Sequence, residues 1–85
     1  MLEVYSDVAT PSILRVRMSG DPGAKLERIS WSLDGKSPQE TPMLQVPEGD
    51  HEIYVTAIVE GAEFKYRGSS TRVIHEQVKV VPHKD

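Results

Sequence analysis

The chain has 85 residues, no cysteine and a formal net charge of −3. The missing cysteines exclude disulfides, thiolate-based zinc or iron–sulfur sites and a thiol nucleophile, so packing and backbone hydrogen bonds must stabilise the fold. Charges of both signs are scattered, so nucleic acid is not an expected partner, and no apolar run approaches the roughly 20 residues that cross a bilayer.

The length and the even composition predict a single domain over residues 1–85, soluble and not inserted in a membrane. Its first residues lack the basic start and the apolar run of a signal peptide, and the compartment stays open. Short stretches in which apolar and polar residues alternate, the pattern of half-buried strands, recur along the chain. They predict strands at residues 2–5, 14–18, 28–33, 44–46, 52–60, 62–67 and 78–80.

Turn signals separate these strands. Glycine, proline and aspartate gather at residues 19–23, Asp34-Gly35 ends the third strand, and residues 68–71 form a loop that leads into the last strand. Three prolines in residues 36–47 keep that segment from being a central strand, because proline has no N–H to donate to a ladder. About seven short strands with turns between them predict an all-β sandwich or barrel.

One hairpin has a predicted register. If Glu60 and Gly61 form a two-residue turn, Val59 faces Ala62 and the inward residues of both strands meet, as the pleat requires. The other inward pairs are Ala57 with Phe64 and Val55 with Tyr66, and the outward pairs are Ile58 with Glu63, Thr56 with Lys65 and Tyr54 with Arg67. The last pair could place a guanidinium on a phenol ring, worth roughly 0.5–1 kcal/mol when exposed.

The inward positions predict one hydrophobic core. Its expected members are Trp31, Ile29, Leu33, Val16, Ile53, Val55, Val59, Phe64 and Val80. Trp31 shares a face with Ile29 and Leu33, which favours burial over an exposed platform for a sugar ring. Glu76 is in phase with the apolar side of the last strand, and a bulge, an edge position or a strand end would keep its carboxylate out of the core.

Two segments resemble immunoglobulin-like modules. Residues 29–35, Ile-Ser-Trp-Ser-Leu-Asp-Gly, are similar to the third strand and following turn of bacterial modules of the polycystic-kidney-disease type. Residues 46–57 are similar to the Pro-x-Gly-x-His/Tyr segment that leads into their long strand. The resemblance, shared with fibronectin type III domains, implies an antiparallel two-sheet immunoglobulin-like sandwich, with the His51 ring against the turn and a nitrogen available to the backbone. It implies no particular function, because this architecture carries many.

The polar residues form no catalytic or metal-binding motif. His51, His75 and His83 have none of the i, i+2 or i, i+4 spacings of ligand pairs, so a metal site would require them to converge in the fold. The serines lie in no nucleophile elbow, and Asp34-Gly35 lacks the repeated oxygen ligands of a calcium loop. We therefore expect no catalytic residue, no metal and no cofactor.

The expected function is binding rather than catalysis. The residues predicted to point outward beside one another are Arg28, Tyr54, Ile58, Lys65 and Arg67. Such a mixed face suits contact with another protein or a neighbouring domain, although an ordinary solvated sheet face has a similar composition. The alternative is a carbohydrate-binding accessory module of an extracellular bacterial protein, which an exposed Trp31 would favour. A small enzyme is the weakest candidate.

A chelator tests the expectation of no metal. Adding EDTA should leave the melting temperature unchanged, because no bound ion is expected to contribute to the free energy of folding. A drop of several degrees on chelation, followed by circular dichroism, would show that the histidines converge on an ion.

Overall fold

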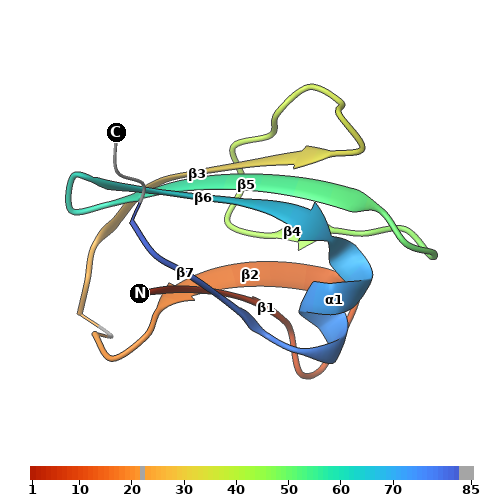
Figure 1. Ribbon diagram of the computed structural model, residues 1–85, viewed down its shortest axis with the longest axis horizontal. Coiled ribbons are helices and arrows are strands. Elements are labelled where there is room, and N and C mark those ends of the chain that lie inside the picture. Colours follow the sequence, from red (N-terminus) through yellow and green to blue (C-terminus); the bar gives the residue numbers. More distant parts are fainter. Residues whose placement is uncertain (22, 83–85) are drawn as a thin grey trace.

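The computed structural model describes residues 1–21 and 23–82. Within these residues the chain forms β1 (Leu2–Ser6), β2 (Ile13–Met18), β3 (Leu26–Leu33), β4 (Leu44–Gln45), β5 (Glu52–Val59), β6 (Ala62–Ser69), α1 (Ser70–His75) and β7 (Val78–Val80). One antiparallel sheet has the order β4-β2-β1-β7 and the other the order β3-β5-β6. The sheets lie face to face as two layers, with α1 at one end (Figure 1). The predicted all-β, antiparallel two-sheet sandwich is confirmed.

Two tight turns border the three-stranded sheet. Asp34 and Gly35 have φ angles of 51° and 76°, and Glu60 and Gly61 have φ angles of 49° and 83°. Positive φ at both central residues is the type I′ geometry, whose twist matches that of antiparallel strands. The second turn joins β5 to β6, and every residue pair predicted for this hairpin is observed.

The core lies between the two sheets. Seven of its nine predicted members are buried, while Val16 and Leu33 are partly exposed and pack against the others. Trp31 is fully buried, and its indole N–H donates a hydrogen bond to the carbonyl of Thr41 at 3.0 Å, so its one polar atom is satisfied. The core also contains residues outside the predicted set: Leu2, Val4, Leu14, Leu44, Val46, Ala57, Val73 and Val78.

The segment after β6 differs from the prediction. Residues 70–75 form α1 instead of a loop and the start of a strand, and Ser69 caps the helix by accepting a hydrogen bond from the backbone N–H of Arg72. Val73 anchors the helix in the core. A helix of six residues has fewer than two turns, too few for an apolar repeat to show in the sequence. Glu76 follows the helix, exposed and paired with Arg72 at 3.1 Å, so its carboxylate never faces the core.

Replacing Trp31 by alanine tests this core. The free energy of unfolding should fall by about 3–5 kcal/mol, because a cavity replaces the largest buried side chain. That loss is enough to unfold a domain at the lower end of the usual stability range of about 5–15 kcal/mol. The measurement is a urea titration followed by circular dichroism.

The matched control for this experiment is Val8→Ala. Val8 is 99% exposed, so its truncation should leave the urea midpoint unchanged. If the Trp31→Ala midpoint also stays in place, the core is wrongly assigned.

Candidate binding face

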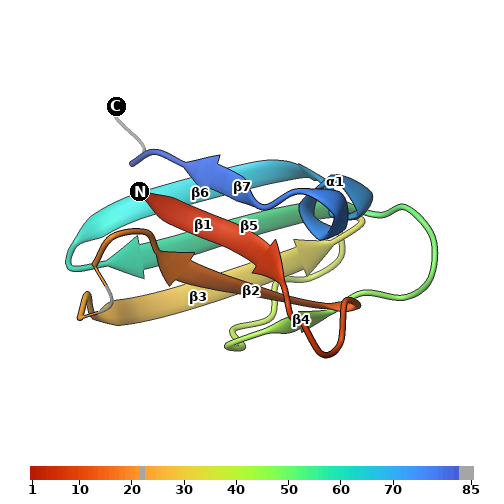
Figure 2. The ribbon, with the colours of Figure 1, turned by 90° about the horizontal axis from the view of Figure 1, so that it is seen from below.

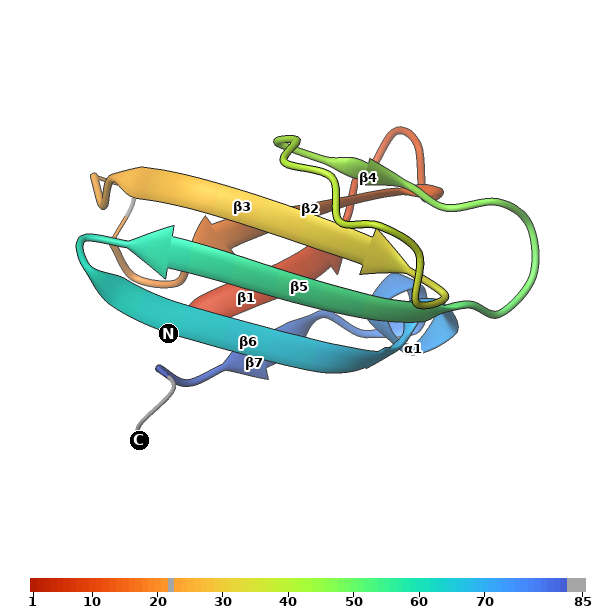
Figure 3. The ribbon, with the colours of Figure 1, turned by 90° about the horizontal axis from the view of Figure 1, so that it is seen from above.

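The outer face of the three-stranded sheet, turned toward the viewer in Figure 3, carries the predicted contact residues. Because β3 pairs with β5 and β5 with β6, outward side chains line up in cross-strand rows. The three rows are Ser32–Tyr54–Arg67, Ser30–Thr56–Lys65 and Arg28–Ile58–Glu63. These nine side chains are called the β3–β5–β6 face below.

All five predicted contact residues belong to the β3–β5–β6 face. Arg28, Tyr54, Lys65 and Arg67 are exposed, and Ile58 is half-buried. The Tyr54 side chain stands in the middle strand with 38% of its surface exposed. Among the residues of the face it alone is an exposed large hydrophobic side chain, so it is the natural anchor for a contact.

Arg67 does not stack on Tyr54, and this detail of the prediction is wrong. The two residues are cross-strand neighbours as expected, but the guanidinium donates from Nε and Nη2 to one carboxylate oxygen of Glu52, at 3.3 and 3.1 Å. Charge-assisted hydrogen bonds of this kind are stronger than neutral ones, and they draw the guanidinium along the sheet. The Tyr54 ring is therefore left open to a partner.

The other two cations of the face also have acidic neighbours. Lys65 pairs with Glu63 at 3.5 Å, and Arg28 pairs with Glu40 of the segment beside β3. These pairs are exposed, so each contributes only about 0–1 kcal/mol and exchanges easily for a partner's charge. A shallow hollow of about 210 Å³ lies at this end of the face, lined by Arg28, Ser30, Thr56, Ile58 and Glu63.

The outer face of the four-stranded sheet, which is turned toward the viewer in Figure 2, carries contacts among its own side chains. Arg17 donates from Nε to Glu3 at 3.0 Å and from Nη2 to Gln77 at 3.1 Å. Its guanidinium also lies 4.2 Å from the ring centre of Tyr5. Glu3 is only 6% exposed beneath this cover. The contacts hold the Arg17 guanidinium over Glu3 and Tyr5, while about half of the Arg17 side chain stays exposed at 51%.

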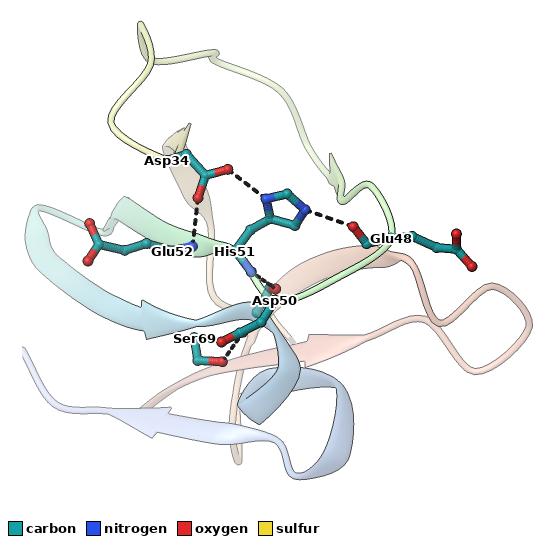
Figure 4. A network of polar contacts seen from close by, with 7 residues as sticks. Asp34, Glu48, Asp50, His51, Glu52 and Ser69 are labelled. Atoms are coloured by element: carbon teal, nitrogen blue, oxygen red, sulfur yellow. Dashed lines mark hydrogen bonds and ion pairs between the residues drawn. The ribbon is translucent and has the colours of Figure 1, made fainter.

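His51 joins the turn after β3 to the chain that enters β5 (Figure 4). Its Nδ1 lies 2.6 Å from Oδ2 of Asp34, and its Nε2 lies 3.0 Å from the carbonyl oxygen of Glu48. Oδ1 of Asp34 accepts the backbone N–H of Glu52 at 2.9 Å. The Glu48 contact confirms the predicted ring position, whereas the partnership with Asp34 was not predicted. The only feature of the sequence that could have indicated this contact is that both residues adjoin the ends of β3 and β5, which pair with each other.

The position of the ring fixes its protonation. Both nitrogens of His51 face oxygens that only accept, so both must donate, which favours the imidazolium. The hydrogen bond to Asp34 raises the pKa of His51 above its ordinary value, and a backbone carbonyl adds to this. The same bond and the Glu52 N–H lower the pKa of the Asp34 carboxyl. The ring has no nitrogen left to take a proton from a nucleophile, and the Ser69 hydroxyl donates to Asp50 instead.

The described residues hold no group of three histidine, aspartate or glutamate side chains arranged for a metal ion, and His83 lies outside them. Over the same part of the chain no helix has the length and apolar character needed to cross a membrane.

No family model, no curated protein and no solved structure matches the chain.

The His51–Asp34 contact predicts a pH dependence of stability. Because folding raises the pKa of His51, the stabilisation is fully present below the unfolded pKa of about 6.5 and is lost as the pH rises through the folded value. The melting temperature should therefore fall as the pH rises above about 6.5. Asp34, whose pKa is lowered, adds stability above its unfolded value of 3.8 that disappears in more acidic solution.

Asp34→Asn is the matched variant for this measurement. Asparagine tolerates the positive φ of this position and keeps an oxygen for the Glu52 N–H, while the charge is removed. The decline of the melting temperature above about pH 6.5 should flatten in the variant. Equal slopes in the two proteins would mean that the dyad does not set the pH response.

Proposed function

We propose that this domain is a non-catalytic, immunoglobulin-like module that binds another protein or a neighbouring domain through the β3–β5–β6 face. The observation that carries the proposal is the register of the three strands. It gathers an exposed tyrosine, a half-buried isoleucine and three exchangeable cations on one face. Arginine and tyrosine are enriched where proteins meet, and hydroxyl residues between them supply adaptable hydrogen bonds.

The sheet order supports the immunoglobulin-like assignment. In constant-type immunoglobulin domains the first, second, fifth and fourth strands form one sheet and the third, sixth and seventh the other. Here β1, β2 and β4 share one sheet and β3, β5 and β6 the other, which is the same arrangement with the fourth strand omitted. α1 and β7 are additions that return the chain to the edge of β1.

The burial of Trp31 favours protein over carbohydrate as the ligand. A sugar-binding module needs an exposed aromatic ring as a stacking platform, and the only tryptophan of the chain lies in the core. Tyr54 is the one aromatic side chain on the β3–β5–β6 face, and its cross-strand neighbours are Ser32 on one side and the ion-paired Arg67 on the other. The engagement of both His51 ring nitrogens supports the non-catalytic part of the proposal.

Alanine substitutions on the face test the proposal. A partner captured with the wild-type domain and then purified should lose affinity by about 1–2 kcal/mol, or roughly 5–30-fold in Kd, when Tyr54 or Arg67 becomes alanine. The measurement is isothermal titration calorimetry, with circular dichroism to show that each variant is folded. Glu52→Gln separates the loss of Arg67 itself from the effect of leaving Glu52 without its partner.

Arg15→Ala is the control on the opposite face. Arg15 pairs with Asp7 at the edge of that face and should tolerate truncation. Arg17 is unsuitable, because its removal would leave the buried carboxylate of Glu3 uncompensated. If Arg15→Ala weakens the partner while Tyr54→Ala and Arg67→Ala do not, the contact lies elsewhere. Binding of soluble oligosaccharides that Tyr54→Ala abolishes would favour the carbohydrate alternative.

A further inference from the structure

The two long sides of the sandwich are closed differently. On the side of β3 and β4, the segment after the Asp34-Gly35 turn folds back over the edge of β3. Trp31 exchanges both of its backbone hydrogen bonds with Gln39, at 2.8 and 2.7 Å, and its indole N–H reaches Thr41. This side of the sandwich is therefore covered by the chain itself.

The opposite side, between β6 and β7, stays open along its middle. The chain leaves α1 at one end, runs along β1 as β7, and reaches β6 just after β7, in a bridge between Phe64 and Pro82 (Figure 1). Between these two ends lies a crevice of about 550 Å³. Its lining includes Lys65, Tyr66, Arg72, Val78, Lys79 and Pro82.

The edge of β7 presents free backbone groups to this crevice. The hydrogen bonds from Ser19 N to Met1 O and from Asp7 N to Ile13 O show that the odd residues of β1 bond to β2. Its even residues therefore bond to β7, through Val78 and Val80. The N–H and C=O of Lys79, between them, point away from β1 and toward the open side.

The edge of β6 has the same character. The backbone N–H of Asp34 donates to Glu52 at 2.8 Å, so the even residues of β5 bond to β3 and the odd residues to β6. The partners of those odd residues are the even residues of β6. The N–H and C=O of Arg67 consequently face the open side, beyond the end that the Phe64–Pro82 bridge engages.

The side chains around the crevice have one sign of charge. Lys65, Arg72 and Lys79 all contribute to its lining, and none of the lining residues is acidic. Lys79 has no ion-pair partner within the described residues, and the pairs of Lys65 and Arg72 with their glutamates are exposed. Lysines on a sheet edge discourage pairing with apolar strands, but they attract an acidic one.

The inner wall of the crevice carries an unsatisfied polar group. The hydroxyl of Tyr66 is buried and has no hydrogen-bond partner among the described residues. The ring lies over Gly68, where a β-carbon would come within 2.3 Å of the hydroxyl oxygen. A glycine here leaves room for the ring beside an edge strand whose backbone groups are still free.

We propose that the β6–β7 crevice binds an extended acidic peptide segment of a partner protein by strand addition. The backbone of the segment pairs with the free groups at Lys79 and Arg67, as in other peptides that extend a sheet edge. Its carboxylates meet Lys65, Arg72 and Lys79. This site shares two residues of β6 with the β3–β5–β6 face, since Lys65 lines the crevice and Arg67 offers it backbone groups, whereas Tyr54 belongs to the face alone.

A model peptide tests the site directly. The probe is an acetylated, amidated octapeptide of alternating valine and glutamate, titrated into the ¹⁵N-labelled domain. The amide protons of Lys79 and Arg67 should become protected from solvent exchange, and binding should weaken as salt is raised. The alternating valine–lysine peptide should not bind, because the crevice repels it.

Two further variants separate strand addition from attraction between charges alone. A probe with N-methyl groups on alternate residues keeps the carboxylates but loses its donors, and its Kd should rise about tenfold, the factor expected for one or two lost hydrogen bonds. Lys79→Ala and Arg72→Ala should each weaken the unmodified probe about two- to fivefold, as for exposed ion pairs. Tyr54→Ala should not change the Kd, so a failure of the β3–β5–β6 face leaves this test unaffected.

Three results would overturn the proposal. The first is no binding of the valine–glutamate peptide at low salt. The second is binding that the N-methylated probe retains in full, which would indicate a diffuse charge contact. The third is a concentration-dependent dimer of the domain alone, seen by analytical ultracentrifugation and disrupted by Lys79→Ala, which would assign the crevice to a second copy of the chain.

Discussion

The burial of Trp31 is the constraint on which the other features depend. An indole N–H removed from water needs an acceptor, and the carbonyl of Thr41 supplies it at 3.0 Å. The backbone of the same tryptophan exchanges two hydrogen bonds with Gln39. Together these bonds hold residues 36–43 over the edge of β3 and close that side of the sandwich. They also fix which alternate residues of β3 face the core. The residues between them therefore face the solvent.

Hydrogen bonds and a tight turn then align β5 and β6 with β3, so that their inward residues face the core as well. Asp34 binds Glu52 through both its backbone N–H and its carboxylate, which aligns the ends of β3 and β5. The turn at Glu60 and Gly61 then fixes β6 against β5 without a register choice. The β3–β5–β6 face thus follows from one buried side chain, the hydrogen bonds between Asp34 and Glu52, and the turn at Glu60 and Gly61. No such chain of constraints governs β7, which is three residues long and, within the part of the chain that the structure describes, pairs with β1 alone.

These constraints explain how much of the molecule the sequence predicts. Alternation and turn chemistry act over neighbouring residues, so the strands, the hairpin register and the burial of Trp31 could be predicted. The sequence could not predict that the Arg67 guanidinium binds Glu52 and does not stack on Tyr54. Both side chains lie within its reach, and side-chain geometry decides between them. The contact of His51 with Asp34, 17 residues away, depends on how two turns meet. The free edges of β6 and β7 depend on the path of the whole chain and leave no local pattern.

Lys65 connects the two surfaces. It stands in the middle row of the β3–β5–β6 face and also lines the β6–β7 crevice, whereas Tyr54 belongs only to the first and Lys79 only to the second. Two separate partners would therefore compete for one ammonium group, and the coupling between them would be small, since a single exposed charge pair contributes about 0–1 kcal/mol. One partner that offers both a surface for the face and an acidic strand for the crevice avoids this cost. Binding at the first site holds its strand at high effective concentration beside the second. The adjacency of the two surfaces along β6 thus favours a single bivalent partner over two independent ones.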